Sequence, residues 1–182
     1  MTTELLAPAG GQEALVAAVQ SGADAVYMGF GAFNARRSAR NFSDEEFRAA
    51  VSYCHLRGVK VYLTLNTLVT DRELPALAAE ARTASECGVD AILVQDWGVL
   101  ATLQKIIPDV PLHASTQMTI HTLDGARQAR DIGFSRVVLS RECTREQIEQ
   151  ITREAGVETE VFVHGALCMC YSGQCYLSAV IG

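Results

Sequence analysis

Short apolar runs alternate with amphipathic segments along the whole chain. The apolar runs have the length and composition of buried strands, and they fall at residues 4–9, 25–30, 60–66, 91–95, 111–116, 136–140 and 158–164. The segments between them show helical periodicity, at residues 10–22, 43–58, 73–88, 98–106, 122–133 and 144–156. The pattern therefore predicts a regular succession of strands and helices.

Local signals mark where several of these helices begin and end. Ser43 is placed as an N-cap, and Glu46 stands three residues later, as in a capping box. Most of the predicted helices end at a glycine, such as Gly22 and Gly58, as expected for a C-terminal cap.

Strand–helix alternation at this spacing predicts parallel strands joined by helical crossovers. Seven units are countable, and the nearest closed form is an eight-unit barrel. We therefore predict an α/β fold, a (β/α)8-type TIM-barrel-like domain truncated after about seven β/α units. The alternative is an open doubly wound sheet. We expect the chain to be a fragment of a longer protein.

Polar residues recur on one face of several predicted strands, near the strand ends. Alternate residues of a strand share a face, which groups Tyr62, Thr64 and Asn66; His113, Ser115 and Gln117; and Glu160, Phe162 and His164, with Asp96 ending the fourth strand. The carboxyl ends of barrel strands form the active-site mouth. The recurrence predicts a polar pocket, although each residue taken singly could serve only to bind a loop.

Composition narrows the class of protein. Hydrophobic residues make up 49% and charged residues 20% of the chain, which is a globular balance. The net charge of −6 shows no overall basic footprint of the kind nucleic-acid binders carry. There is no apolar run long enough to span a membrane. We expect a cytoplasmic protein whose six cysteines are thiols.

Three cysteines follow the last predicted strand, in the stretch VFVHGALCMCYSGQC. Cys168 and Cys175 are seven residues apart, with Cys170 between them, and there is no CxxC pair. Spacing alone leaves a metal site and buried thiols equally open. A cysteine nucleophile activated by His164 is a further alternative.

Arginines follow two of the predicted strands. Arg36 lies beside Asn34 in GAFNARRSARNF, and Arg141 follows the sixth strand. Guanidinium groups bind carboxylates and phosphates well, so an anion site at the mouth is one interpretation. The other is that these arginines are solvated loop residues.

Several stretches together resemble the collagenase-like peptidase family U32, and in particular its RNA-hydroxylating branch. They are ELLAPAGG, AVYMGFGAFNARRSARNF, LTLNTLV, ILVQDWG, HASTQMTIH and FVHGALCMCYSGQC, which cover nearly the whole chain in order. The resemblance implies a barrel-like domain over residues 1–165, followed at 166–182 by the start of a cysteine-containing iron–sulfur segment.

The resemblance also implies a 4Fe–4S cluster, with Cys168 and Cys175 as two of its four ligands and the other two after residue 182. Cys170 stands outside the family pattern and is the less favoured ligand. Branches of the family hydroxylate ribosomal or transfer RNA bases without oxygen, with prephenate as the donor. Others act on a quinone precursor.

The polar strand ends, the loop after the second strand and the resemblance together give two groups of candidate residues; the resemblance itself points to His164, Tyr171, Arg36 and Arg141. The catalytic candidates are His164, Tyr171, Glu160, Asn66, Asp96 and Gln117. The substrate-binding candidates are Arg36, Asn34, Arg141 and His113. The expected partners are RNA, bound through the full-length protein, and a small anionic donor. Self-association of the fragment is also expected, because a barrel lacking a unit exposes an edge.

Three alternative functions remain: a peptidase, a partner in quinone-precursor hydroxylation, and a non-catalytic binding module. A peptidase needs an assembled nucleophile and base or an open hydrolytic metal site. The sequence has neither HExxH nor GxSxG.

Overall fold

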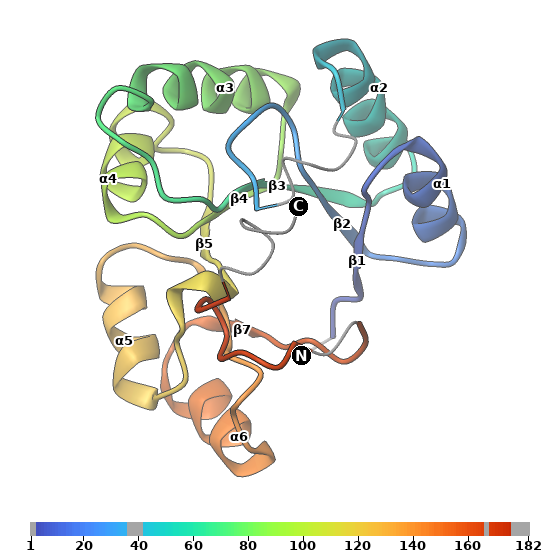
Figure 1. The fold of residues 1–182 in the computed structure, drawn as a ribbon. Coiled ribbons are helices and arrows are strands. Elements are labelled where there is room, and N and C mark those ends of the chain that lie inside the picture. Colours follow the sequence, from blue (N-terminus) through green and yellow to red (C-terminus); the bar gives the residue numbers. More distant parts are fainter. Residues whose placement is uncertain (1–2, 36–41, 166–167, 176–182) are drawn as a thin grey trace. The chain divides into compact units, whose positions relative to one another are not determined.

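The computed structural model describes residues 3–35, 42–165 and 168–175 (Figure 1). The chain forms two compact units, Met1–Pro111 and Leu112–Gly182.

The first unit contains four strands that alternate with four helices. In chain order these are β1 (Leu6–Pro8), α1 (Gln12–Gln20), β2 (Ala25–Met28), α2 (Asp44–His55), β3 (Lys60–Leu65), α3 (Leu74–Cys87), β4 (Ala91–Val94) and α4 (Trp97–Ile106). Neighbouring strands are parallel, with Val26 opposite Val61 and Leu63 opposite Ile92. Each helix therefore serves as the crossover between two parallel strands.

Apolar residues from both layers form the core of this unit. β4 is buried at every position, and β3 at every position after Lys60. The helices contribute the fully buried side chains Leu15, Phe47 and Leu77. The ring of Phe47 also stacks on Phe30, with centroids 4.6 Å apart. Strands buried on both faces read as continuous apolar runs, which explains their pattern in the sequence.

The two ends of α2 are closed in different ways. Ser43 Oγ accepts from the Glu46 backbone N–H at 3.2 Å, and the Glu46 carboxylate accepts from Ser43 N–H at 2.9 Å. The predicted capping box of α2 is therefore confirmed. Gly58 has φ +71°, the left-handed conformation expected of a residue after a helix end.

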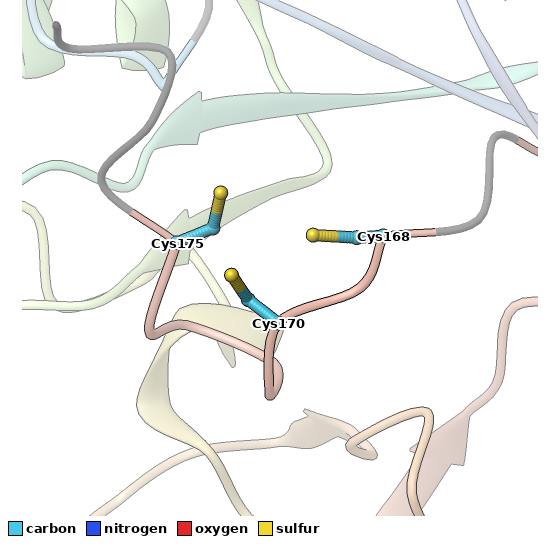
Figure 2. A group of neighbouring side chains, drawn as sticks. All are labelled: Cys168, Cys170 and Cys175. Carbon is cyan, nitrogen blue, oxygen red and sulfur yellow. The ribbon is translucent and has the colours of Figure 1, made fainter.

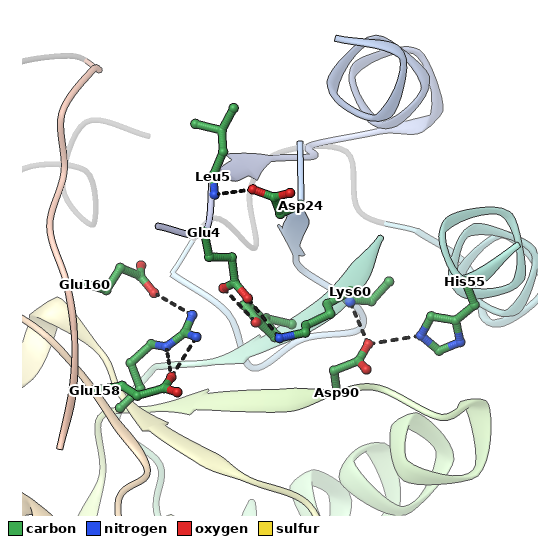
Figure 3. Close-up of polar contacts among 11 residues, drawn as sticks. Glu4, Leu5, Asp24, His55, Lys60, Asp90, Glu158 and Glu160 are labelled. Atoms are coloured by element: carbon green, nitrogen blue, oxygen red, sulfur yellow. Dashed lines mark hydrogen bonds and ion pairs between the residues drawn. The ribbon is translucent and has the colours of Figure 1, made fainter. Parts of the chain in front are cut away.

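Polar contacts also join the amino ends of the strands in this unit (Figure 3). Glu4 accepts from Lys60 Nζ at 3.0 Å and from the Tyr62 hydroxyl at 2.8 Å. His55 Nε2 lies 3.0 Å from Asp90 Oδ2, which also accepts from the backbone N–H of Val61. The sequence grouped Tyr62 with the polar residues of a predicted pocket. Its hydroxyl instead makes a structural hydrogen bond to Glu4, at the amino ends of the strands.

The second unit contains three further parallel strands. Its elements are β5 (Leu112–Ala114), the 3₁₀ turn η1 (Thr116–Met118), α5 (Leu123–Asp131), β6 (Arg136–Val138), α6 (Arg145–Glu154) and β7 (Glu158–Glu160). The helices are amphipathic and bury small or aliphatic residues, among them Ala126, Ala129 and Ile151. Thr144 caps α6 in a second capping box, with Gln147.

The predicted strands and helices are confirmed, although the strands are shorter than predicted. In both units the strand order follows the chain order. A doubly wound sheet would reverse that order at a switch point, so the fold is the truncated TIM-barrel-like form. The predicted boundary at residue 165 stays a prediction. Among the described residues, no helix has the length and apolarity needed to cross a membrane.

Candidate metal centre

Three thiols converge in the second unit, just after β7. The Sγ atoms of Cys168, Cys170 and Cys175 all lie within 4.8 Å of one another, and Figure 2 shows them directed toward a common space. All three side chains are exposed. Thiolates are soft ligands suited to zinc and to iron–sulfur clusters. Of the two interpretations that spacing left open, the geometry favours a metal site over buried thiols.

A tight turn between the second and third cysteines brings them together. The Gln174 backbone N–H donates to Tyr171 O at 3.0 Å, and Gly173 has φ +76°. A Cβ at residue 173 would collide with the carbonyl group of Gln117. Only glycine accepts both the conformation and the close approach. The sequence SGQ within the cysteine stretch is therefore what allows the loop to fold back.

The side chain of Arg141 contacts this loop at three positions. Its Nη2 donates to Cys170 O at 3.2 Å, its Nη1 lies 3.5 Å from Cys168 O, and its Nε donates to Ser172 Oγ at 3.3 Å. One guanidinium group thus contacts the backbone of two of the three cysteine positions.

Ser172 lies at the centre of the loop and is 1% exposed. Its Oγ accepts from the Arg141 backbone N–H at 3.1 Å, and its own N–H donates to Glu142 Oε1 at 3.0 Å. Its carbonyl accepts from Thr119 Oγ1 at 2.8 Å. A buried serine thus has its backbone and side-chain polar groups bonded, as buried polar groups require.

The thiols differ in their ease of ionisation. A hydrogen bond from the Cys170 backbone N–H lowers the pKa of the Cys168 thiol, and Cys175 and Arg141 lower it further. The side chain of Cys175 raises the pKa of Cys170. Elsewhere, burial raises the pKa of Cys54 to about 11. Cys168 therefore forms a thiolate more readily than Cys170 or Cys54.

The predicted polar residues of the first unit are held by its loops. Asn34 is 1% exposed and donates to Gly31 O at 3.4 Å, and Asn66 Oδ1 accepts from Ala35 N–H at 3.1 Å. Asp96 is the N-cap of α4 and accepts from Gly98 N–H at 2.7 Å. The structure thus brings Asn34 and Asn66 to one loop and leaves Asp96 at a helix end. Arg36 lies outside the described residues.

The predicted residues of the second unit occupy different places. His113 is buried in β5, and Ser115 is hydrogen-bonded to Gln117 beside it. Glu160 lies 3.6 Å from Arg136, which is also paired with Glu158 at 2.8 Å (Figure 3). The remaining two, His164 and Tyr171, are exposed.

Sequence reasoning missed three residues that shape these loops: Glu80, Glu142 and Ser172. Glu80 extends from α3 to the loop after β2, where it accepts from Ala32 N–H at 3.2 Å, and burial raises its pKa to about 7. No pattern in the chain links these residues to their partners. For Ser172, its place inside the cysteine stretch was the only available signal.

The chain matches peptidase family U32 over residues 10–182. It is 43% identical over 177 residues to the 23S rRNA 5-hydroxycytidine C2501 synthase of Escherichia coli, covering 96% of this chain and 26% of that protein. It is 35% identical over 175 residues to tRNA hydroxylation protein P1 of Bacillus subtilis, covering 96% of this chain and 42% of that protein.

Among solved structures, the fold is similar to that of the U32 peptidase Mk0906, with a TM-score of 0.69 and 16% identity, over 88% of this chain and 68% of that one. The chain therefore spans less than half the length of the two curated relatives and shares its fold with a structure that carries the family's name. The match over almost all its residues shows that this chain belongs to peptidase family U32.

Proposed function

We propose that this chain is the barrel part of an iron–sulfur-dependent RNA hydroxylase. Such an enzyme adds a hydroxyl group to a base of ribosomal or transfer RNA without using molecular oxygen. The observation that carries the proposal is the 43% identity to a 23S rRNA 5-hydroxycytidine synthase along nearly all of this chain. The likeness to a tRNA hydroxylation protein supports the same class of reaction on a second kind of RNA.

The three-cysteine loop fits the proposed 4Fe–4S cluster in its donor chemistry, because clusters are held by cysteine thiolates. Cys168 and Cys175 would hold two of its irons, and the family resemblance assigns the other two ligands to residues after 182. When bound, such a cluster supplies one-electron transfer. Cys170 contributes a third thiol to the same group.

Two exposed aromatic side chains of the second unit suit an RNA substrate. Tyr171 is 72% exposed next to Cys170, and Phe162 after β7 is 48% exposed. Proteins bind unstacked RNA bases by stacking them on aromatic rings. In this proposal Tyr171 receives a base beside the metal centre, whereas the phosphate contacts come from the rest of the protein, because this chain is acidic overall.

The oxygen donor in the proposal is a small anion such as prephenate. Arg36 and Arg141 were the predicted anion ligands. The side chain of Arg141 already contacts the cysteine loop through Nε, Nη1 and Nη2. An anion there would have to share a guanidinium group that is engaged with the protein.

The family name favours a peptidase as the second candidate function. A cysteine peptidase needs a base beside its thiol. In the described part of the chain, Cys168 is grouped with two other thiols, Cys170 and Cys175, and this group includes no histidine or carboxylate. The arrangement therefore favours metal binding over nucleophilic catalysis.

The test uses a strain from which the full-length gene is deleted, with nucleosides of ribosomal and transfer RNA analysed by mass spectrometry. The proposal expects loss of one hydroxylated base, its restoration by the wild-type gene, and no restoration by Cys168→Ser or Cys175→Ser. Cys143→Ser, a thiol beside α6, is the control and should restore it. Unchanged RNA together with lost peptide hydrolysis would establish the peptidase instead.

A further inference from the structure

The cysteine loop is held in its folded shape by groups that do not bind metal. Ser172 connects two neighbouring residues of another loop: its Oγ accepts from the backbone N–H of Arg141, and its N–H donates to the carboxylate of Glu142. These residues are about thirty positions away in the sequence, so the contacts fasten the loop to the segment between β6 and α6. We call Arg141, Glu142 and Ser172 the clasp.

The clasp acts on the cysteine positions through their backbone. The Arg141 side chain donates to the carbonyl of Cys170 and reaches that of Cys168, while its Nε contacts Ser172 between Cys170 and Cys175. A planar guanidinium with a rigid set of donors fixes the orientation of several acceptors at once. Lysine, with a single flexible ammonium group, cannot make this set of contacts.

The loop is also hydrogen-bonded to Thr119, the residue that directly follows η1. Thr119 Oγ1 donates to the carbonyl of Ser172, and Gln174 Nε2 donates to Thr119 Oγ1 at 3.3 Å. The three Sγ atoms of the loop that these contacts hold lie within 4.8 Å of one another. The hydrogen bonds therefore hold the backbone of a loop in which the three thiols are grouped.

We propose that Arg141, Glu142 and Ser172 are positioning residues that preorganise Cys168, Cys170 and Cys175 for a thiophilic metal. The inference rests on the proposed function, because it concerns the metal centre named there. It assigns Arg141 to the loop backbone and so gives this residue a role other than donor binding. The physical advantage is that an ordered loop has little conformational freedom left to lose when metal binds.

The experiment measures Co²⁺ binding to the full-length gene product in its metal-free form, without oxygen, from the sulfur-to-cobalt absorption. Ser172→Ala, Arg141→Lys and Glu142→Ala are compared with the wild type. Arg145→Lys is the matched control, because Arg145 is exposed and pairs only with Glu149 on its own helix among the described residues. Loss of a residue that orients metal ligands weakens metal binding by about tenfold to a hundredfold.

The expected result is a loss of that size in all three clasp variants, with circular dichroism and thermal unfolding close to wild type and no change in Arg145→Lys. Glu142 is exposed, so its variant keeps the test valid if Arg141→Lys folds poorly. Wild-type affinity in Ser172→Ala and Glu142→Ala, or a wild type that binds no Co²⁺, would overturn the proposal.

Iron and sulfide content of the same proteins, purified without oxygen, separates the two proposals. If the wild type contains a cluster and the clasp variants bind Co²⁺ as tightly as the wild type, the positioning role of the clasp is contradicted and the proposed function is kept. If the wild type contains neither iron nor sulfide but its Co²⁺ binding still depends on the clasp, the positioning role is supported and the iron–sulfur part of the proposed function is contradicted.

Discussion

The carboxylate of Glu80 accepts a hydrogen bond from the backbone N–H of Ala32 at 3.2 Å, although the two residues are 48 positions apart in the chain. The contact places an acidic group of α3 against Gly31, whose φ of +64° lies in the left-handed region. A Cβ at residue 31 would collide with that carboxylate. The loop after β2 is thus shaped around a partly buried acid.

Glu80 gives the fold a stability that depends on pH. Burial raises the pKa of Glu80 from 4.5 to about 7, so the folded state binds the proton more tightly than the unfolded state. The slope of unfolding free energy with pH is therefore negative. This contribution is fully present below about pH 4.5 and is lost as pH rises through about 7.

We expect Glu80→Gln to remove this component. The free energy of unfolding of the variant, relative to that of wild type, should rise by about 1 kcal/mol between pH 5 and pH 8. This value is reduced for solvent screening, because the side chain is only partly buried. Urea unfolding at several pH values measures the difference. Glu86→Gln, an exposed residue of the same helix, is the control. Parallel pH profiles for wild type and Glu80→Gln would contradict the expectation.

Gly173→Ala should disrupt the cysteine loop. The substitution places a side chain in the left-handed conformation, which costs about 1 kcal/mol, and also against the carbonyl group of Gln117. Gly58→Ala is the matched control, because φ there is +71° but nothing lies within 4 Å of the added Cβ.

Both variants are expected to lose stability in thermal unfolding, but only Gly173→Ala should also lose bound iron after purification without oxygen. Equal iron content in the two variants would mean that the turn at Gly173 does not control the metal centre.

Asp96 offers a way to separate a structural from a catalytic role. Because its carboxylate caps α4, Asp96→Ala is expected to cost about 1 kcal/mol of unfolding free energy. Asp96→Ser should restore most of that stability, since serine is also a good N-cap. If RNA modification recovers with stability in Asp96→Ser, the residue acts through the helix. Lost activity in a stable Asp96→Ser would instead support the predicted catalytic role.

The thiols should react with iodoacetamide in a defined order in the metal-free protein. Cys168 is exposed and its pKa is lowered by the Cys170 backbone N–H, so it should be alkylated first at pH 8. Cys54 is buried, its pKa is raised to about 11, and it should be alkylated last. Timed quenching followed by peptide mass spectrometry gives the order. Early alkylation of Cys54 would contradict this expectation.

The extent of the strands shows where local pattern stops being sufficient. Residues 158–164 read as one strand, but β7 ends at Glu160, opposite Val138 at the end of β6. Val161 to Val163 are exposed and lie outside the ladder. A strand requires a hydrogen-bonded partner beside it, and the apolar pattern contains no information about the length of that partner.

The features of the candidate site likewise fall into those visible in the sequence and those that depend on contacts between distant residues. The cysteine stretch and its place after the last strand were visible in the residue order, because they depend on neighbours along the chain. The bonds from Arg141 to Cys168, Cys170 and Ser172 cross 27 to 31 positions. Whether Arg141 would face an anion or a loop could not be decided by spacing, because both arrangements use the same arginine after the same strand.

The sequence by itself determined the order of strands and helices, the cap at Ser43, and the parallel (β/α) class, because these follow from periodicity and from contacts a few residues apart. Tertiary structure alone decided that three exposed thiols meet, that Ser172 is buried among them, and that Glu80 is held at a raised pKa. Each of these depends on desolvation and on bonds between distant segments, which exist only once the chain has packed.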